Sequence, residues 1–289
     1  MADLLDVARF VEKSLVAGAE HFQELTSTND RAKDLAGRDD LPLPYLVVAE
    51  HQTAGRGRGA NRWWTGPGSL AFSVIYDRTS FAGAETDSVP RPCPTGDFPA
   101  APPLHTPEHA EAEAGTVCSA VPALAAGIAV CDAVRPLVPP GPPLGICWPN
   151  DVYVGARKLS GTLVETVAKA RCVVGIGINV NNRSSDAPAS LRDRVVSLVD
   201  LVGGPLDRGD ILEAVLTGLR RLHTQSAGQI AARADSLCLQ KGHPLEIEIG
   251  ERTLSGVCRG IDSQGRIVLD SQGETVRCVS GIVRTPRTS

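Results

Sequence analysis

The sequence has 289 residues, enough for one large domain or for one medium-sized domain and a small one. Its 42% hydrophobic and 21% charged residues are typical of a globular protein, and the absence of any run of ~18 apolar residues excludes a membrane span. Its formal net charge of −4 disfavours general binding to nucleic acid, because phosphate backbones attract basic proteins.

In chain order, the elements predicted before residue 117 are two helices and two strands, at 3–16, 31–36, 45–50 and 69–76. A loop rich in Gly and Arg, at 51–68, separates the two strands. Residues 77–116 combine many prolines with few apolar side chains, so we expect a long, disordered insertion there.

Beyond the insertion, an Ala-rich buried helix is predicted at 117–134, and four strands follow at 144–148, 151–154, 158–166 and 171–180. Two further helices are expected at 207–222, which Asp207 caps, and at 229–239. The tail reads as four short strands at 244–249, 252–261, 266–270 and 274–278. The sequence therefore predicts an α+β domain over 1–240 and a small all-β domain over 241–289.

The eight cysteines are dispersed, and no two of them form a CxxC pair. Zinc sites and thioredoxin-type motifs use such pairs, so we expect reduced thiols and no metal site. The first 20 residues lack the apolar stretch of a signal peptide. Together these features predict a cytoplasmic protein.

The most distinctive segment is the run GRGRGANRW at 55–63. Alternating glycines let the backbone approach a ligand closely, and the arginines between them suit phosphate or carboxylate. A basic loop for nucleic acid and a merely solvated linker remain open on composition alone. Neither of the common nucleotide-binding motifs occurs in the chain. There is no GxxxxGK[ST], and the glycines of Gly175-Ile176-Gly177 are not followed by the third glycine of GxGxxG.

Two other segments carry candidate site residues. Asn150 and Asp151 follow a strand, where they could face metal-bound phosphates or simply form a turn. Lys158 begins the next strand and Gly161 lies inside it, where a glycine often marks the close approach of a ligand. Asn179 leaves a buried strand, and its amide could reach a site or form an Asx turn.

In their order and spacing, the motifs STN at 27–29, EHQTAGRGRGANRWW, WPNDVYV, RKLSGTLVE and VVGIGINVNN resemble those of the biotin protein ligases, the biotin–acetyl-CoA-carboxylase ligases. The resemblance runs from about residue 25 to 201, continues more weakly into the tail, and leaves the insertion outside. It implies a mixed β-sheet catalytic domain with helices, of the class II synthetase-like, biotin–lipoate ligase type. A small SH3-like β-barrel would follow it.

The activity implied by the resemblance is the activation of biotin by ATP, with Mg²⁺, to biotinyl-5′-AMP. The biotinyl group then passes to one lysine of the biotin carboxyl carrier domain of a carboxylase. Lys158 and Arg58 are the implied catalytic residues. The implied biotin contacts are Ser27, Thr28, Asn29, Gln52, Arg56, Gly57, Arg58, Lys158 and Gly161. The implied contacts with ATP or the adenylate are Arg56, Arg58, Arg62, Trp63, Asn150, Asp151 and Asn179.

The chain departs from the family pattern at Cys147, where a lysine often precedes WPND. The 26 residues before Ser27 are too few for the winged helix-turn-helix of ligase-repressors, so we expect no nucleic-acid partner. The lack of a long apolar run predicts that there is no membrane partner either. The alternatives are a lipoate or octanoate ligase or transferase of the same fold, a biotin-sensing transcriptional regulator, and an inactive biotin-binding protein. The sequence leaves a monomer and a homodimer open.

Overall fold

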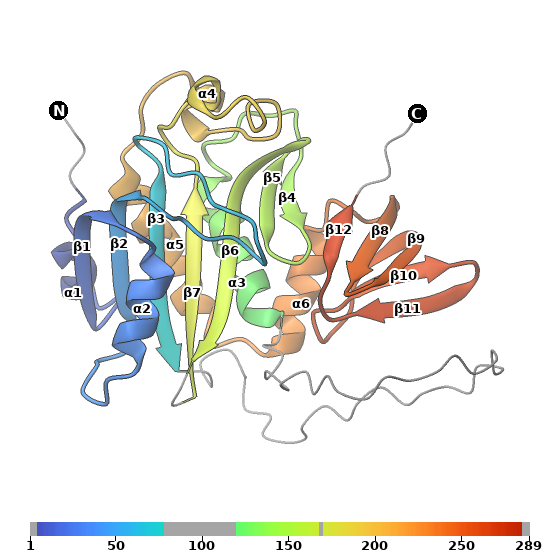
Figure 1. Cartoon of the computed structure of the whole chain (residues 1–289), viewed down its shortest axis with the longest axis horizontal. Coiled ribbons are helices and arrows are strands. Elements are labelled where there is room, and N and C mark those ends of the chain that lie inside the picture. Colours follow the sequence, from blue (N-terminus) through green and yellow to red (C-terminus); the bar gives the residue numbers. More distant parts are fainter. Residues whose placement is uncertain (1–4, 78–119, 168–169, 285–289) are drawn as a thin grey trace.

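The computed structural model describes residues 5–77, 120–167 and 170–284, and it contains two β-sheets with helices on both faces of the larger one (Figure 1). The larger sheet has seven strands in the order β1-β2-β3-β7-β6-β5-β4. Only the pair β1–β2 is parallel. The strands are β1 (Gly18–Leu25), β2 (Tyr45–Gln52), β3 (Leu70–Asp77), β4 (Leu144–Cys147), β5 (Asp151–Val154), β6 (Arg157–Val167) and β7 (Arg171–Ile178).

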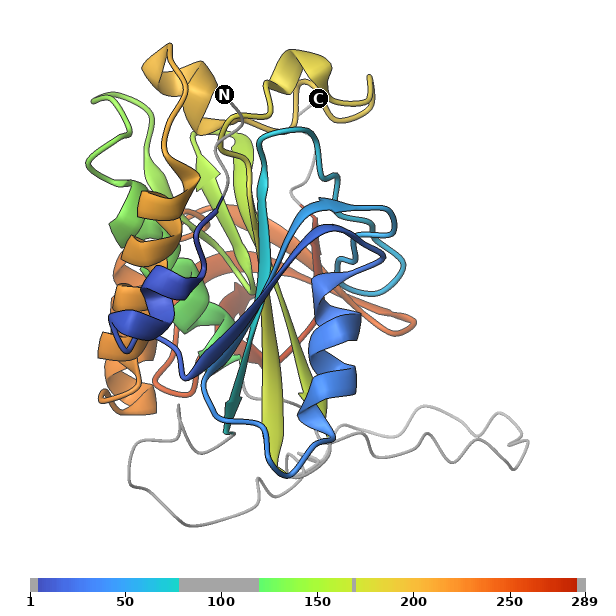
Figure 2. The same ribbon diagram turned by 90° about the vertical axis from the view of Figure 1, so that its left-hand side faces the viewer.

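Helices cover this sheet unequally (Figure 2). Among the described residues, one face carries only α2 (Thr28–Ala36), which packs through Ala32, Leu35 and Ala36. The other face carries a helical layer built around the almost wholly buried α3. The helices of that layer are α1 (Ala8–Glu12), α3 (Val121–Val134), α5 (Arg208–Leu222) and α6 (Ala227–Ser236). Between β7 and α5 lie the short helices η2 (Ser184–Asp186) and α4 (Leu198–Val202).

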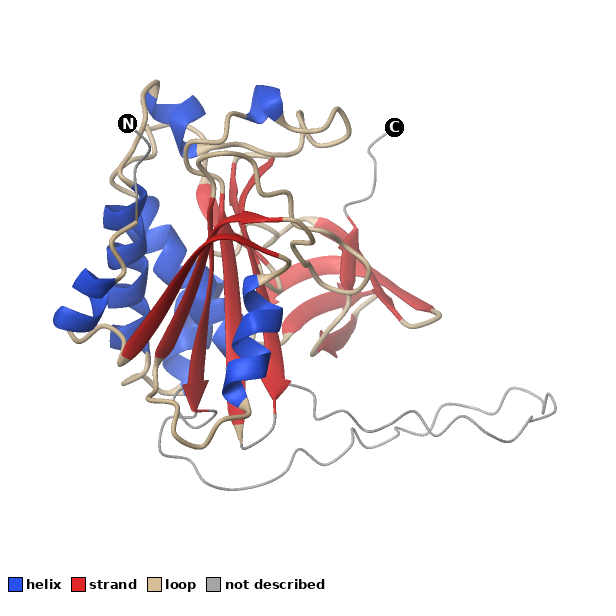
Figure 3. Ribbon diagram, turned by 60° about the vertical axis from the view of Figure 1, so that its left-hand side comes forward, coloured by secondary structure: helices blue, strands red, loops and turns tan. Residues whose placement is uncertain are grey.

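The tail forms a five-stranded antiparallel sheet in the order β11-β10-β9-β8-β12, beside the larger sheet (Figure 3). Its strands are β8 (Pro244–Ile249), β9 (Arg252–Ile261), β10 (Ile267–Ser271), β11 (Glu274–Cys278) and β12 (Ile282–Arg284). Its inward side chains, such as Ile247 and Leu269, join the same apolar cluster as α3 and α5. The mixed α+β architecture with a C-terminal β-module is therefore confirmed, whereas the division at residues 240/241 stays a prediction.

Several predicted elements need correction. The helix predicted over 3–16 is the short α1, because the chain turns at Ser14 (φ +53°) to start β1. The helix predicted over 229–239 begins earlier and ends at Ser236. Its last residues instead pair with β4, where the Ile146 amide donates to the Leu237 carbonyl at 2.7 Å. The helix predicted from residue 117 is described from Val121 onward, and the insertion after Asp77 lies outside the described residues.

Strands β1 and β12 and helix α4 were not predicted. β1 (GAEHFQEL) is an edge strand whose residues are half-buried or exposed, so it lacks the apolar alternation that marks a strand. Within the described ranges, no helix is long and apolar enough to cross a membrane.

Candidate active site

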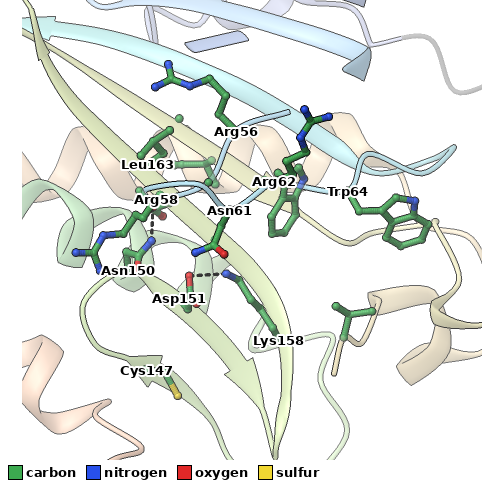
Figure 4. A pocket seen from close by; sticks show the side chains of 18 of the residues that line it. Arg56, Arg58, Asn61, Arg62, Trp64, Cys147, Asn150, Asp151, Lys158 and Leu163 are labelled. Carbon is green, nitrogen blue, oxygen red and sulfur yellow. Dashed lines mark hydrogen bonds and ion pairs between the residues drawn. The ribbon is translucent and has the colours of Figure 1, made fainter. Parts of the chain in front are cut away.

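A cavity of about 570 Å³ lies between the Gly-Arg loop and strands β5, β6 and β7, with β12 of the small sheet along one side (Figure 4). All fourteen residues predicted for the site line it, although they come from segments up to 152 positions apart, Ser27 and Asn179 being the extremes. They are Ser27, Thr28, Asn29, Gln52, Arg56, Gly57, Arg58, Arg62, Trp63, Asn150, Asp151, Lys158, Gly161 and Asn179. The predicted residues thus form one site.

The Gly-Arg loop folds into a small hairpin rather than an open coil. The Gly57 amide donates to the Asn61 carbonyl at 2.8 Å, and the Trp63 amide donates to the Gly55 carbonyl at 3.0 Å. Gly59 at its tip has φ +59°, a conformation that favours glycine. The hairpin backbone is therefore held by hydrogen bonds of its own.

Trp63 rests on two glycines of the sheet. A Cβ at Gly177 would overlap the indole ring, and a Cβ at Gly161 would lie 3.2 Å from the ring and 3.0 Å from the Lys158 ammonium. Lys158 Nζ lies 5.7 Å from the ring centroid. Among the described residues, the buried indole Nε1 has no hydrogen-bond partner, so it is a donor available to a ligand.

The STN turn begins α2 and forms one end of the cavity. Ser27 is the N-cap of the helix, and its Oγ accepts from the Asp30 amide. The backbone amide and the hydroxyl of Thr28 both donate to Gln52 Oε1, at 2.8 and 3.2 Å. Gln52 Nε2 in turn donates to Thr65 Oγ1 at 3.3 Å. These bonds fix the orientation of the Gln52 amide, so that its acceptor faces the helix.

Asn29 lies beneath this turn and is buried. Its Nδ2 donates to the Leu163 carbonyl and to Glu165 Oε2, and its Oδ1 accepts from Ser73 Oγ at 2.6 Å. A Cβ at Gly175 would overlap Asn29 Oδ1, so this glycine is needed to seat the side chain. In this conformation protein groups bind both ends of the Asn29 amide. This bonding is typical of a residue that shapes the pocket rather than of one that grips a ligand.

The two arginines of the loop point to different partners. The Arg56 guanidinium binds Glu165 and Asp30, at 2.9 and 2.7 Å, and points away from Lys158 (Figure 4). Arg58 reaches the small sheet, where Nη1 donates to the Gly281 carbonyl at 3.1 Å. Burial lowers the pKa of Arg58, and the nearby Asp151 carboxylate offsets part of this effect. Arg58 is thus a partly desolvated cation, and such a cation attracts anions strongly.

Lys158 and Asp151 form an ion pair, with 2.7 Å between Nζ and Oδ1. Asn150 next to Asp151 donates its Nδ2 to the Thr162 carbonyl at 2.5 Å. Asn179 is buried and accepts from Asn182 Nδ2 at 2.9 Å. This end of the cavity therefore combines cations, amides and one carboxylate, which suits an anionic group such as a phosphate.

The described part of the chain holds no group of three or more His, Cys, Asp or Glu side chains able to bind a metal ion.

Comparison with known proteins identifies the family. Residues 21–87 and 110–181 match the model of the biotin/lipoate A/B protein ligase family, and the interruption of the match falls within the predicted insertion. The chain is 34% identical over 245 residues to the biotin--[acetyl-CoA-carboxylase] ligase of Mycobacterium tuberculosis, covering 82% of this chain and 77% of that protein. This chain belongs to the biotin protein ligase family.

Other relatives agree with this assignment. The bifunctional ligase/repressor BirA of Escherichia coli is 25% identical, over 86% of this chain and 68% of that protein. Among solved structures, the biotin protein ligase of Aquifex aeolicus in complex with biotin and ATP superposes with a TM-score of 0.71. It is 24% identical and covers 93% of this chain and 99% of that one, so it confirms the fold.

Within this ligase, the cavity is also lined by residues that were not predicted as binding residues, among them Asn61, Cys147, Tyr153 and Arg194. Burial raises the pKa of Cys147 to about 12, so the position before WPND holds a neutral thiol rather than a cation. Two further residues, Ser73 and Glu165, hold the STN turn in place. Ser73 could have been recognised as the single uncharged polar residue inside the apolar strand LAFSVIYD.

Proposed function

We propose that this chain activates biotin with ATP to give biotinyl-5′-AMP, and transfers the biotinyl group to a lysine of a biotin carboxyl carrier domain. The observation that carries the proposal is the division of the cavity into two chemically different ends. Hydrogen-bonding side chains of the STN turn and Gln52 line one end, and Arg58 and Lys158 line the other. The 34% identical mycobacterial biotin--[acetyl-CoA-carboxylase] ligase supports the carboxylase carrier as the partner.

The uncharged end suits the ureido head of biotin, which has both donors and acceptors to satisfy when it is buried. Thr28 and Gln52 supply such groups, already oriented by their mutual bonds. Gly161 and Gly177 let the Trp63 ring pack directly on the sheet, so the ring borders the middle of the cavity, where the apolar chain of biotin could lie against it.

In the first step, a carboxylate oxygen of biotin attacks the α-phosphorus of ATP, and pyrophosphate leaves. Negative charge accumulates on the phosphorus oxygens, and Lys158 and Arg58 lie where fixed cations would stabilise it. Lys158 would exchange or share its bond with Asp151 as the anion arrives.

Mg²⁺ would enter with the phosphates of ATP. The oxygens of Asp151 and Asn150 are hard donors of the type that Mg²⁺ prefers, so the residues present fit such an ion. Its chemistry would be to neutralise charge on the leaving pyrophosphate.

In the second step, the lysine amine of the carrier attacks the carbonyl carbon of the mixed anhydride, the C–O bond to phosphate breaks, and AMP leaves. The hairpin and Trp63 would exclude water in the interval between the two steps. We further propose that the reaction takes place in the cytoplasm.

Biotin-dependent release of pyrophosphate from ATP tests the first step. We expect release with biotin and none with lipoate at equal concentration. Release with lipoate and none with biotin would contradict the proposal, and would assign the chain to the lipoate branch of the family.

A further inference from the structure

Glu165 ends the RKLSGTLVE motif, yet the proposed reaction gives it no role. It lies on β6 opposite Val173 of β7, and 20% of its side chain is exposed. Its carboxylate lies outside the cavity lining, behind the STN turn and beside the root of the Gly-Arg hairpin.

The carboxylate joins three separate segments. Oε2 accepts from Asn29 Nδ2 at 2.9 Å and from Arg56 Nη1 at 3.1 Å. Oε1 accepts from Arg56 Nη2 at 2.9 Å and from Lys33 Nζ at 3.2 Å. One side chain thus holds strand β6, helix α2 and the hairpin together.

The charges of this cluster balance. Asp30 binds both Arg56 and Lys33, at 2.7 and 3.0 Å, so two carboxylates face two cations. Burial raises the pKa of Glu165, but hydrogen bonds from Asn29, Arg56 and Lys33 outweigh it, so its pKa lies below the ordinary value. An ionised Glu165 carboxylate therefore holds both the root of the Gly-Arg hairpin and the STN turn at neutral pH.

The bond to Asn29 also fixes the orientation of the Asn29 amide beside the STN turn. Because Nδ2 of Asn29 faces Glu165, its Oδ1 faces Ser73 Oγ. Ser73 Oγ lies 2.8 Å from Thr28 Oγ1, which donates to Gln52 Oε1. Each hydroxyl has one proton, so while Ser73 donates to Asn29 and Thr28 donates to Gln52, no hydrogen lies between Ser73 and Thr28. Loss of the Glu165 acceptor would free the Asn29 amide to turn and let Ser73 donate to Thr28 instead, so a change at Glu165 would alter the donors and acceptors at the uncharged end of the cavity without touching a ligand.

We propose that Glu165 is a positioning residue. It holds the hairpin over the cavity through Arg56, and it fixes the orientation of the STN turn through Asn29. The proposal rests on the proposed function. It predicts two separable effects, because a neutral amide could still accept from Asn29 but could not pair with Arg56 and Lys33.

Two substitutions separate these effects. Glu165→Gln keeps an acceptor for Asn29 and loses the charge, so we expect the bound adenylate to be lost about tenfold faster while KM for biotin changes little. Glu165→Ala loses both, so KM for biotin should also rise about tenfold. Adenylate retention is measured from the lifetime of the enzyme-bound species after removal of free biotin and ATP.

The matched control is Glu24→Gln. Glu24 lies on the edge strand β1, and its exposed carboxylate pairs with His51 of β2, so this variant should behave as wild type. In the Glu165→Gln background, Arg56→Met should speed adenylate loss by a smaller factor than it does in the wild-type protein, because only the bond from Arg56 to Asp30 remains to be removed. Retention and KM within twofold of wild type in both Glu165 variants would overturn the proposal. An equal loss of kcat in both Glu165 variants, with unchanged KM for biotin and unchanged adenylate retention, would show a merely structural role and would also overturn the proposal. Failure of the wild-type protein to form an adenylate would instead refute the proposed function.

Discussion

Arg56 and Lys158 are both cations of the site, yet their surroundings suit them to different roles. Arg56 is held between two carboxylates at the root of the hairpin, whereas Lys158 has Asp151 as its acidic partner and faces the cavity. We therefore propose that Lys158 stabilises the transition state and that Arg56 anchors the loop.

The role of Lys158 leads to a kinetic prediction. Lys158→Ala should still bind biotin, because the STN turn and Gln52 are untouched, but adenylate formation should slow by about 10²–10³. Biotin-dependent pyrophosphate release measures the rate, and direct titration with biotin measures the binding. Near-normal pyrophosphate release would remove Lys158 from the mechanism.

Gly175 is predicted to control biotin binding through Asn29. Gly175→Ala places a methyl group onto Asn29 Oδ1, which must move and break its bonds to Ser73 and Glu165. We expect KM for biotin to rise about tenfold or more, with a smaller change in KM for ATP. Gly204→Ala is the control, because a Cβ there meets open space. Equal biotin KM values for the two variants would contradict this account.

The fourteen predicted residues of the candidate site came from the resemblance of its motifs to those of the biotin protein ligases, and all of them line the cavity. The residues alone left the motifs open, because Asn150, Asp151 and Asn179 could equally form turns. The partners of these residues could not be predicted. The bonds from Glu165 to Asn29 and Arg56 join positions 136 and 109 residues apart, and such contacts follow from the packing of α2 against strands β2, β3 and β7 of the sheet. For the same reason, the sequence did not separate the role of Arg56 from that of Arg58.

At the scale of elements, the strongly apolar segments were predicted best. β3, β7 and α3 are buried on all sides and read as continuous apolar runs, whereas β1 is a polar edge strand and was missed. The ends of helices were also mispredicted where the following residues pair with a strand, as they do with β4 after Ser236.

The end of α5 carries a pH-dependent element. His223 is its C-cap, and its ring packs edge-on against Tyr76 with centroids 4.3 Å apart. Burial lowers the pKa of His223 from 6.5 to about 4. Below about pH 6.5 the unfolded chain therefore binds a proton that the folded chain does not, so acid favours unfolding.

We expect the free energy of unfolding to be fully retained above pH 6.5 and to fall by about 1–3 kcal/mol between pH 6.5 and 4 through this residue. Urea unfolding at several pH values measures the slope, and His223→Gln should flatten it. His243→Gln, at an exposed position, is the control. An unchanged slope in His223→Gln would refute the assignment.

At the scale of the whole molecule, one apolar cluster runs through both sheets. Trp148 lies at their junction and is 2% exposed. Its Nε1 donates to the Gly265 carbonyl at 2.9 Å in the turn between β9 and β10. Arg58 adds a second link by its bond to Gly281, so the small sheet forms part of the cavity wall.

Trp148→Phe should therefore destabilise the whole molecule rather than the small sheet alone. Loss of the indole donor leaves a buried carbonyl unsatisfied and costs about 2 kcal/mol. Denaturant unfolding followed by circular dichroism would show one transition shifted to lower denaturant. Trp64→Phe, at a partly exposed tryptophan, should shift less. A separate early transition in Trp148→Phe would show that the small sheet unfolds independently.

The most direct test of the central claim is the labelling of a purified biotin carboxyl carrier domain by this protein. With biotin and ATP together, we predict that the carrier gains one biotinyl group on one lysine, read from its intact mass. Omission of ATP, or replacement of that lysine by arginine, should abolish the gain. A carrier that stays unmodified, although the protein binds both biotin and ATP, would contradict the assignment as a biotin protein ligase.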